Sequence, residues 1–284
     1  MFSRLFCDRW ITLGVVRPLV RLGLYRPKPG VPILMYHSIC DDPEPGVAPY
    51  YRLNTSPARF REQMKWLRED GWQVVPLGEA VRRAGDGRRV AAITFDDGYR
   101  DFLTNAWPVL QEFSYPVTVF LPTGLIDAGD GFRGKPCLDW DEVRRLAAEG
   151  VAFGSHTVTH ARLAALPSDR LTGELLHSKR SLEDHVTTSV EGFSYPYAFP
   201  EHDVTFCRSF GRLAQECGYG YVLTTRIGRH RTGDSPWRVR RLPCNGADDR
   251  RLLAAKLSGM YDWLSAPQLL TKCLLGSRRH RGEI

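Results

Sequence analysis

The chain has 284 residues, of which 43% are apolar and 11% aromatic, and its length suits a single α/β barrel with a large core. Its 39 basic and 32 acidic residues leave a net charge of +7. No basic stripe interleaved with aromatic residues crosses the middle of the chain, so we expect no nucleic-acid partner.

Seven cysteines are scattered along the sequence without a Cys-x-x-Cys pair. This pattern argues against a disulfide scaffold and against a cysteine zinc site, and it is typical of a reducing compartment. No apolar run reaches the roughly 18 to 20 residues of a membrane span, and the run 10–16 makes a poor secretory signal. We therefore expect a location in the cytoplasm or peripheral to the inner membrane, without a clear signal peptide.

Residues 1–30 form an N-terminal extension in which arginines separate apolar residues at near-helical spacing: Phe2, Leu5, Phe6, Trp10, Leu13 and Val16. Two interpretations stay open. The segment is either a basic amphipathic helix that makes peripheral contact with an anionic membrane, or a helix packed on the neighbouring domain. The basic C-terminal extension, 246–284, contains a helical segment over 252–275 and poses the same choice.

Between these extensions, 31–245 alternates strand-like with helix-like runs. Strands are expected at 31–36, 72–75, 90–95, 116–121, 151–155, 191–195 and 219–223. Helices are expected at 56–70, 77–84, 101–113, 139–149, 167–185 and 205–217. This alternation predicts parallel strands with crossover helices. Since no Gly-x-Gly-x-x-Gly follows the first strand, a barrel with its site at the carboxyl ends of the strands is the better prediction.

Two short motifs follow such strands. Thr-Phe-Asp-Asp-Gly at 94–98 places Asp96 and Asp97 where a buried strand surfaces, and adjacent residues there point in different directions. His-Thr-Val-Thr-His at 156–160 spaces His156 and His160 as i and i+4, which on a helical first turn puts both imidazoles on one face. Each motif alone also fits a solvated turn or surface histidines.

Together the two motifs provide the donor set of a divalent metal site. Two imidazoles and one carboxylate, from His156, His160 and Asp97, hold such an ion and leave positions open for water and substrate. Because a bound cation lowers the pKa of its water, the neighbouring carboxylate of Asp96 can take the proton as general base.

Three further positions lie near strand ends. His37 follows the first strand, where a histidine is either structural or a general acid that protonates a leaving nitrogen. Phe-Ser-Tyr-Pro-Tyr at 193–197 contains a proline that fixes the backbone, so the amide of Tyr197 can donate to an oxyanion. Tyr195 and Tyr197 can equally be rim packing, with Tyr195 a candidate for substrate binding. Trp140 offers either a wall for sugar stacking or a core side chain.

These motifs resemble those of the polysaccharide deacetylases, the NodB-homology group of carbohydrate esterases, over about residues 31–242. The resemblance implies a distorted (β/α) barrel of about seven strands and metal-dependent removal of N-acetyl, or sometimes O-acetyl, groups from sugars. It implies Asp96 as base, and Asp97, His156 and His160 as ligands of zinc, with cobalt or nickel as substitutes. The aromatic residue that ends the third motif, Tyr197, would lend its amide to the oxyanion.

Two departures from the family pattern matter. The third motif often carries an arginine where Ser194 stands, so orientation of the base would come from elsewhere, such as Asp139. The late Leu-x-His motif is absent, and 240–245 reads Arg-Arg-Leu-Pro-Cys-Asn instead. The early Met-Tyr-His-Ser resembles the exopolysaccharide subgroup, in which an N-terminal histidine replaces the late one. This resemblance points to His37 as the acid.

The sequence thus predicts a metal-dependent deacetylase domain over 31–245 that acts on N-acetylated sugars of a bacterial surface polysaccharide or its precursor. A deacylase of a small amide or an O-acetyl ester is one alternative. An inactive carbohydrate-binding module is another, but it would be expected to carry a damaged motif, whereas Asp96, Asp97, His156 and His160 are all present.

Overall fold

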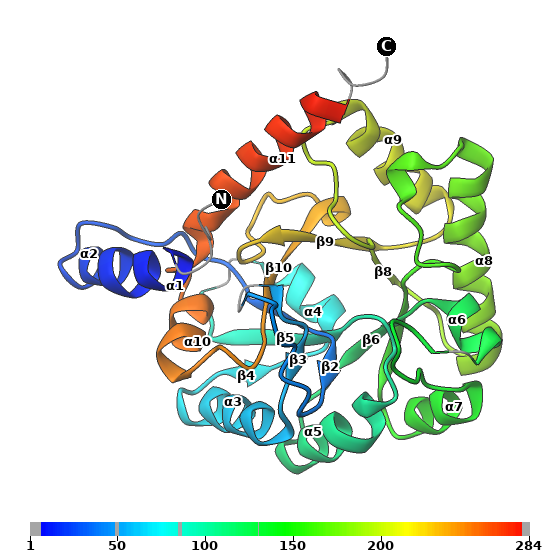
Figure 1. Ribbon diagram of the computed structural model, residues 1–284, viewed down its shortest axis with the longest axis horizontal. Coiled ribbons are helices and arrows are strands. Elements are labelled where there is room, and N and C mark those ends of the chain that lie inside the picture. Colours follow the sequence, from blue (N-terminus) through cyan, green and yellow to red (C-terminus); the bar gives the residue numbers. More distant parts are fainter. Residues whose placement is uncertain (1–6, 49–50, 85–86, 130, 280–284) are drawn as a thin grey trace.

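The computed structural model describes residues 7–48, 51–84, 87–129 and 131–279. Seven parallel strands close into a barrel in the order β1, β10, β9, β8, β7, β6, β5 and back to β1 (Figure 1). The strands are β1 Ile33–Tyr36, β5 Val90–Phe95, β6 Thr118–Leu121, β7 Ala152–Ser155, β8 Gly192–Ser194, β9 Tyr221–Ile227 and β10 Val239–Pro243. The predicted distorted (β/α) barrel of about seven parallel strands is confirmed.

Strand β5 explains the distortion of the barrel. Its first residues pair with β4 (Gln73–Val74), and its last four pair with β1 along the same edge. Strand β4 therefore lies outside the closed ring as an additional strand. A separate two-stranded sheet, β2 Ser38–Ile39 with β3 Asn54–Thr55, follows β1.

Helices surround the barrel (Figure 1), and the sequence carries recognisable start signals for two of them. Ser56 caps α3, whose first residue is Pro57. Asp139 and Glu142 form a capping box on α7. The helices of the barrel are α3 Pro57–Glu69, α4 Leu77–Arg82, η3 Phe102–Ala106, α5 Trp107–Phe113, α6 Thr123–Ala128, α7 Trp140–Ala148, α8 Ser168–Val186 and α9 Val204–Glu216.

Side-chain alternation divides the strands into an inner and an outer face. Leu34, Ile93 and Leu242 belong to the large core between barrel and helices. Ile33, Ala92, Phe120, Leu223 and Val239 belong to a second apolar cluster, which fills the amino-terminal half of the barrel. Because alternate residues share a face, continuing the inner series along β1, β5 and β10 leads to His37, Asp96 and Arg241.

One glycine is required by this inner packing. A Cβ atom added at Gly154 of β7 would come within 2.3 Å of the Phe120 ring. Real side chains do not approach so closely, and Phe120 is fully buried. Gly154 therefore makes the room that the largest apolar side chain of the inner cluster on β6 needs.

The N-terminal segment is helical and docks on the barrel domain. It comprises α1 Cys7–Ile11, η1 Thr12–Val16 and α2 Arg17–Arg21, and it packs on α10 (Arg250–Leu257). Tyr261 donates a hydrogen bond to Asp8, and the Trp263 indole N–H donates to Thr12 Oγ1 at 3.0 Å. The predicted residues Phe2, Leu5 and Phe6 lie outside the described residues.

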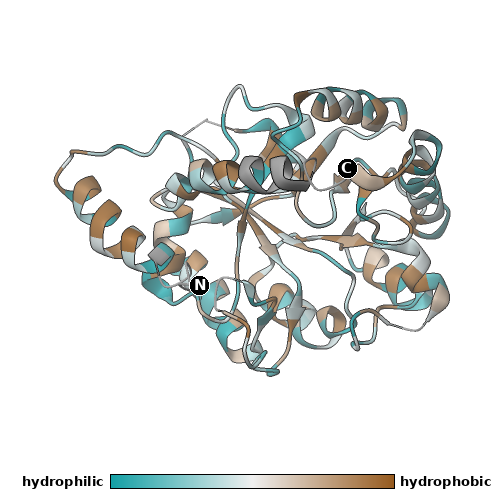
Figure 2. Ribbon diagram, turned by 45° about the horizontal axis from the view of Figure 1, so that its top comes forward, coloured by the Kyte–Doolittle hydropathy of each residue, from teal (hydrophilic) through white to brown (hydrophobic). Residues whose placement is uncertain are grey.

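The same segment also carries exposed apolar side chains. In Figure 2 the ribbon of the helix that projects from the barrel is largely brown, the colour of apolar residues. The side chain of Trp10 is 68% exposed, and those of Leu22 and Leu24 are each 72% exposed. Among the described residues, no helix is both long enough and apolar enough to cross a bilayer. The final helix, α11 Ser265–Arg279, packs along β9 and follows the short helix η6 Asp262–Leu264.

Candidate active site

Asp97, His156 and His160 lie together at the carboxyl ends of β5 and β7. Asp97 Oδ1 is 3.4 Å from His156 Nε2 and 3.2 Å from His160 Nε2. One candidate ligand atom from each side chain lies within 4.8 Å of the other two, and all three residues are buried. Because both Nε2 atoms face the same carboxylate oxygen, the three can converge on a single cation.

The hydrogen bond of His156 prepares its ring for a metal. Its Nδ1 lies 2.7 Å from the carbonyl oxygen of Ser194. Since a carbonyl only accepts, Nδ1 carries a proton, so Nε2 is the ring nitrogen that can bind a metal. Burial raises the pKa of Asp97, but its hydrogen bonds with the two histidines outweigh burial and hold that pKa well below its ordinary value. The donor set therefore fits a divalent ion.

The predicted helical turn at 156–160 is wrong, because these residues form a tight loop. Thr157 and His160 adopt left-handed backbone conformations, with φ of 75° and 55°, and the amide of His160 donates to Thr157 Oγ1. The Glu174 carboxylate of α8 accepts from the amides of Val158 and Thr159 at 2.8 and 2.9 Å. This buried carboxylate, which the sequence did not single out, fixes the loop that carries both imidazoles.

Asp96 is held by an arginine that the sequence did not reveal. Arg241 Nη1 and Nη2 donate to Asp96 Oδ1 and Oδ2, each at 2.7 Å. Ser194 Oγ accepts from Arg241 Nη2 at 2.9 Å and donates to Asp96 Oδ2 at 3.2 Å. The Arg241 side chain is 0% exposed, so this bidentate pair is enclosed within the barrel.

The expected orienting role of Asp139 is therefore wrong. Asp139 accepts from the amide of Glu142 as the N-cap of α7, whereas Arg241 of β10 provides the guanidinium that the third motif lacks. A signal was present in the sequence: Val239 and Arg241 share one face of a short strand-like run. The two adjacent arginines made this run difficult to recognise as a strand.

The Arg241 pair sets the charge of Asp96. Burial alone would raise the pKa of this carboxyl, but the positive charge and hydrogen bonds of Arg241 hold the pKa below its ordinary value. Asp96 is consequently ionised at neutral pH, as a general base must be.

His37 follows β1 and is half-buried. Burial lowers the pKa of its imidazole, opposed by the negative charges of Asp97 and Asp96. The ring is therefore neutral at neutral pH, and it lies within electrostatic range of both carboxylates. Its predicted role as general acid would require that it first take up a proton.

The two tyrosines of the third motif differ in exposure. Tyr195 is 2% exposed and packs edge-on against Phe199 and Phe210. Its predicted contact with substrate is therefore wrong, because the ring belongs to the core beneath the rim. The Tyr197 ring is 37% exposed and lies 4.6 Å from the His160 ring.

The backbone of Tyr197 is left-handed, with φ of 55°. Its carbonyl accepts from Thr225 Oγ1 at 3.0 Å, and no described residue accepts a hydrogen bond from its amide. Asp97, Thr157 and His160 share the left-handed conformation, which is costly for residues other than glycine. Such strained backbone gathers where the candidate ligands and the predicted oxyanion donor meet.

Trp140 begins α7 and contacts other helices. Its ring stacks on His185 of α8, with centroids 3.8 Å apart, and its indole N–H donates to Asp127 at 2.6 Å. One face of the ring is thus already covered. The role of Trp140 in sugar stacking stays a prediction.

Cations and aromatic rings surround the ligand group on the rim. Phe132 lies 4.8 Å from the His160 ring, and the guanidinium groups of Arg133 and Arg162 lie 5.8 and 5.1 Å from the centre of the Tyr197 ring. The arrangement offers flat apolar surfaces beside hydrogen-bond donors, a combination that suits the faces and hydroxyl groups of sugars.

Comparisons with known proteins agree on one family and one fold. The family model for polysaccharide deacetylase matches residues 83–222. Bacillus subtilis YxkH is 27% identical over 202 residues, covering 70% of this chain and 65% of that protein. The poly-beta-1,6-N-acetyl-D-glucosamine N-deacetylase of Escherichia coli K12 is 30% identical over 147 residues, covering 46% of this chain and 21% of the enzyme. The chain thus spans less than two thirds of either relative.

Two solved structures share the barrel. The Streptococcus pyogenes deacetylase PplD in complex with acetate aligns with a TM-score of 0.67 and 24% identity over 81% of this chain and 99% of that one. IcaB from Ammonifex degensii aligns with the same TM-score and identity over 83% and 100%. At this identity the likeness concerns the fold alone.

Proposed function

We propose, since residues 83–222 of this chain match the family model for polysaccharide deacetylase, that it is a metal-dependent hydrolase that removes N-acetyl groups from a bacterial surface glycan or its precursor. The observation that carries the proposal is the convergence of Asp97, His156 and His160 on one point, next to an ionised Asp96 that Arg241 holds in place. A set of potential ligands and a separate base are what amide hydrolysis requires.

Asp97 Oδ1, His156 Nε2 and His160 Nε2 would hold the cation. Two imidazoles and one carboxylate favour zinc, and cobalt or nickel accept the same donors. When bound, the ion polarises the acetamide carbonyl and lowers the pKa of its water. We propose zinc as the ion that the protein uses in the cell, on the basis of this donor chemistry.

The remaining residues move and place protons. Asp96 removes a proton from the attacking water, and Arg241 keeps the carboxylate ionised and oriented toward the reacting centre. The Tyr197 amide donates to the oxyanion as the acyl carbon becomes tetrahedral. His37 takes up a proton and passes it to the amine nitrogen as the carbon–nitrogen bond breaks, so that acetate and a free amine leave.

The substrate class is supported by a relative and by the rim. The Escherichia coli relative is named for poly-beta-1,6-N-acetyl-D-glucosamine. The partly exposed Tyr197 and the half-buried Phe132 provide surfaces against which a pyranose ring can stack, and Arg133 and Arg162 provide donors for its oxygens. We therefore propose N-acetylglucosamine units of an exopolysaccharide as the first substrate to test.

The direct experiment measures acetate release from poly-β-1,6-N-acetylglucosamine oligomers by the full chain. Release should stop after chelation and return on addition of zinc. An O-acetylated glycan, tested in parallel, distinguishes amide from ester hydrolysis. If the folded, zinc-loaded protein releases no acetate from N-acetylated glycans yet cleaves the O-acetyl ester, the substrate proposal is wrong. Glycan binding without release from either substrate would favour the inactive carbohydrate-binding module.

A further inference from the structure

The N-terminal segment presents an apolar surface to solvent although its other side is docked. We define the outer surface as the exposed apolar residues of the helix α1–α2 and the turn that follows: Trp10, Val15, Leu19, Leu22, Leu24 and Tyr25. Figure 1 shows α2 standing away from the barrel. Single exposed apolar residues are common, but six within sixteen positions form a patch that suggests a partner.

The turn after α2 gathers the last four of these residues. The amides of Leu24 and Tyr25 both donate to the Leu19 carbonyl, at 2.9 and 3.2 Å, and the amide of Gly23 donates to Val20 at 3.0 Å. Gly23 permits this reversal with φ of 73°. Backbone hydrogen bonds thus hold the apolar side chains together at the outermost part of the segment.

The opposite side of the helix is fastened to the domain. Asp8 accepts from Tyr261, Thr12 accepts from Trp263, and Arg9 pairs with Asp249 of the α10 cap. Thr12 and Val16 are buried against α10. The outer surface is therefore not a packing face that has yet to dock on the barrel, because the segment already packs on the barrel domain through its opposite side.

The charge of the segment indicates what the partner is. Residues 9–28 contain five basic residues and no acidic residue: Arg9, Arg17, Arg21, Arg26 and Lys28. Apolar side chains interleaved with cations and with no acidic side chain match the interface of a bilayer that carries anionic headgroups. A protein partner would need an acidic surface with an apolar centre, and nothing in this chain's described surface suggests a second copy in that role.

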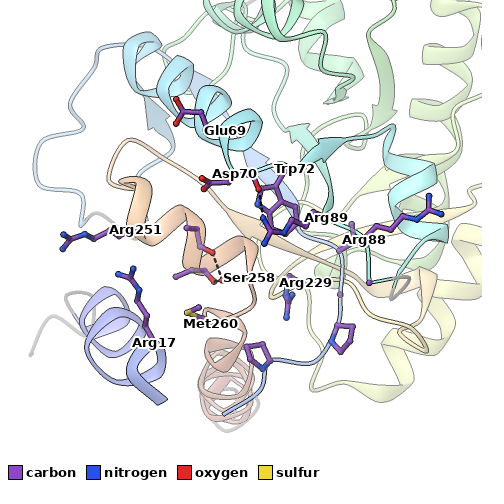
Figure 3. Close-up of a pocket in the computed structure, with 17 residues that line it drawn as sticks. Arg17, Glu69, Asp70, Trp72, Arg88, Arg89, Arg229, Arg251, Ser258 and Met260 are labelled. Carbon is purple, nitrogen blue, oxygen red and sulfur yellow. Dashed lines mark hydrogen bonds between the residues drawn. The ribbon is translucent and has the colours of Figure 1, made fainter. Parts of the chain in front are cut away.

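A basic pocket lies next to this surface, between α2, α10 and the amino ends of the barrel strands (Figure 3). Its volume is about 730 Å³, and five arginines line it: Arg17, Arg88, Arg89, Arg229 and Arg251. Two acidic residues, Glu69 and Asp70, also line it, but Arg250 pairs with both carboxylates at 2.9 and 2.8 Å. The pocket therefore has a surplus of positive charge.

Two of these arginines are available for a ligand. Arg229 is engaged with Asp262 and with the Lys28 carbonyl. Arg17 of α2 and Arg251 of α10, by contrast, form no ion pair within the described part of the chain. Figure 3 shows their side chains on the same side of the pocket. Two guanidinium groups placed in this way suit the oxygens of a phosphate group.

We propose that the outer surface and this pocket together bind a membrane rich in anionic phospholipid. The apolar side chains enter the interface between headgroups and acyl chains, and Arg17 and Arg251 bind a headgroup phosphate. The residues that line the pocket just before β1, β4 and β5 lie at the amino ends of the strands. The candidate active site lies at the carboxyl ends, so membrane contact leaves it open to a glycan.

Vesicle flotation of the full chain tests this proposal independently of catalysis. Vesicles of phosphatidylcholine alone are compared with vesicles that also contain phosphatidylglycerol. We expect binding to the anionic vesicles only, weakened by salt. The double variant Leu22→Asp/Leu24→Asp should reduce binding by at least about tenfold, as should Arg17→Glu/Arg251→Glu.

Matched controls come from the far side of the barrel. Val204→Asp replaces a comparably exposed apolar residue of α9, and Arg180→Glu reverses an exposed charge on α8; both should bind as the parent does. Circular dichroism melting checks that every variant is folded. All changed residues of the outer surface are solvent-exposed, so folding is expected to survive.

Four results would overturn the proposal. One is equal flotation with Leu22→Asp/Leu24→Asp, and another is no flotation of the parent with anionic vesicles. The third is binding of inorganic phosphate, measured by calorimetry, that Arg17→Glu/Arg251→Glu abolishes, in a parent protein that does not bind vesicles. The pocket would then bind a soluble anion. A concentration-dependent dimer that breaks up in Leu22→Asp/Leu24→Asp, without vesicle binding, would assign the outer surface to a second copy of the chain.

Discussion

The amino-terminal half of the barrel is filled by Ile33, Ala92 and Val239, whereas the carboxyl ends of the same three strands carry His37, Asp96 and Arg241. The inner faces of β1, β5 and β10 thus change from apolar to polar within one strand length. The apolar half stabilises the fold through burial. The polar half costs desolvation energy, which is repaid only by pairing such as that of Asp96 with Arg241. Substitutions at the two ends should therefore separate activity from stability.

The largest expected effect is on catalysis at the polar end. Asp96→Asn removes the proposed base but keeps all three candidate ligands, so acetate release should fall by about 10²- to 10⁴-fold with zinc binding retained. Asp141→Asn is the control, because that exposed carboxylate of α7 pairs with Arg144 rather than with the ligand group. The initial rate of acetate release and the zinc content are measured on the same preparation. Parental rates from a zinc-loaded Asp96→Asn protein would remove Asp96 from the mechanism.

Arg241→Gln breaks the buried pair and should therefore change both the stability and the activity of the protein. It leaves the Asp96 carboxylate buried without its cation, which costs about 3–5 kcal/mol of the free energy of unfolding at neutral pH. Denaturant unfolding measures this loss. Arg241→Lys keeps the charge but not the bidentate geometry, so it should recover part of the stability.

The same substitution should change the pH dependence of activity. In the parent, Arg241 holds the pKa of Asp96 below its ordinary value, so the base stays ionised and the stability from the pair is lost only as pH falls through that lowered pKa. In Arg241→Gln the pKa rises, so acetate release should decline at a higher pH than in the parent. An acid limb at the same pH in both proteins would show that Asp96 does not set it.

At the apolar end, Phe120→Ala should lower stability by about 3–5 kcal/mol through the cavity it creates. Gly154→Ala should cost about 1–3 kcal/mol, because the new methyl group meets the Phe120 ring. In the double variant Phe120→Ala/Gly154→Ala the methyl group gains room, so the combined loss should be smaller than the sum. Additive losses would mean that the two side chains do not compete for space. Turnover per folded molecule should stay close to that of the parent.

The alternation of strands and helices was predictable from the sequence because apolar runs and helix start signals mark them directly. Strand β10 was not, because Arg240 and Arg241 interrupt its apolar character, and the partner of Arg241 is the distant Asp96. Without β10, the closing strand of the barrel and the orienting arginine were both missed. A residue pair separated by 145 positions leaves no local trace in a single sequence.

The conformation of the candidate site was likewise only partly predictable from the sequence. The residue types and spacing of Asp97, His156 and His160 indicated a metal, and the structure brings the three together. The spacing of the histidines suggested a helical turn, but the loop is fixed by Glu174 from another helix. Tyr195 and Tyr197 look alike in sequence, yet the chain bends between them, so that one enters the core and the other stays at the rim.

The smallest expected effect concerns the N-terminal segment. Arg9→Ala removes a partly exposed pair with Asp249, so the loss of stability should be at most about 1 kcal/mol. Burial raises the pKa of Asp249, but Arg9 outweighs it and lowers that pKa, so the contribution is present at neutral pH and is lost as pH falls through the lowered value. Thermal melting of both proteins at neutral and acidic pH, at low and high salt, measures it. A difference that persists unchanged at high salt would contradict an ionic origin.

Metal stoichiometry tests the central claim most directly. The parent, Asp96→Asn and His156→Ala are each loaded with zinc, dialysed and measured by elemental mass spectrometry, with folding checked by circular dichroism. Convergence of Asp97, His156 and His160 on one cation predicts a single retained ion per chain in the parent and in Asp96→Asn, and loss of that ion in His156→Ala. Retention of the ion by a folded His156→Ala protein, or a parent that holds none, would contradict the account.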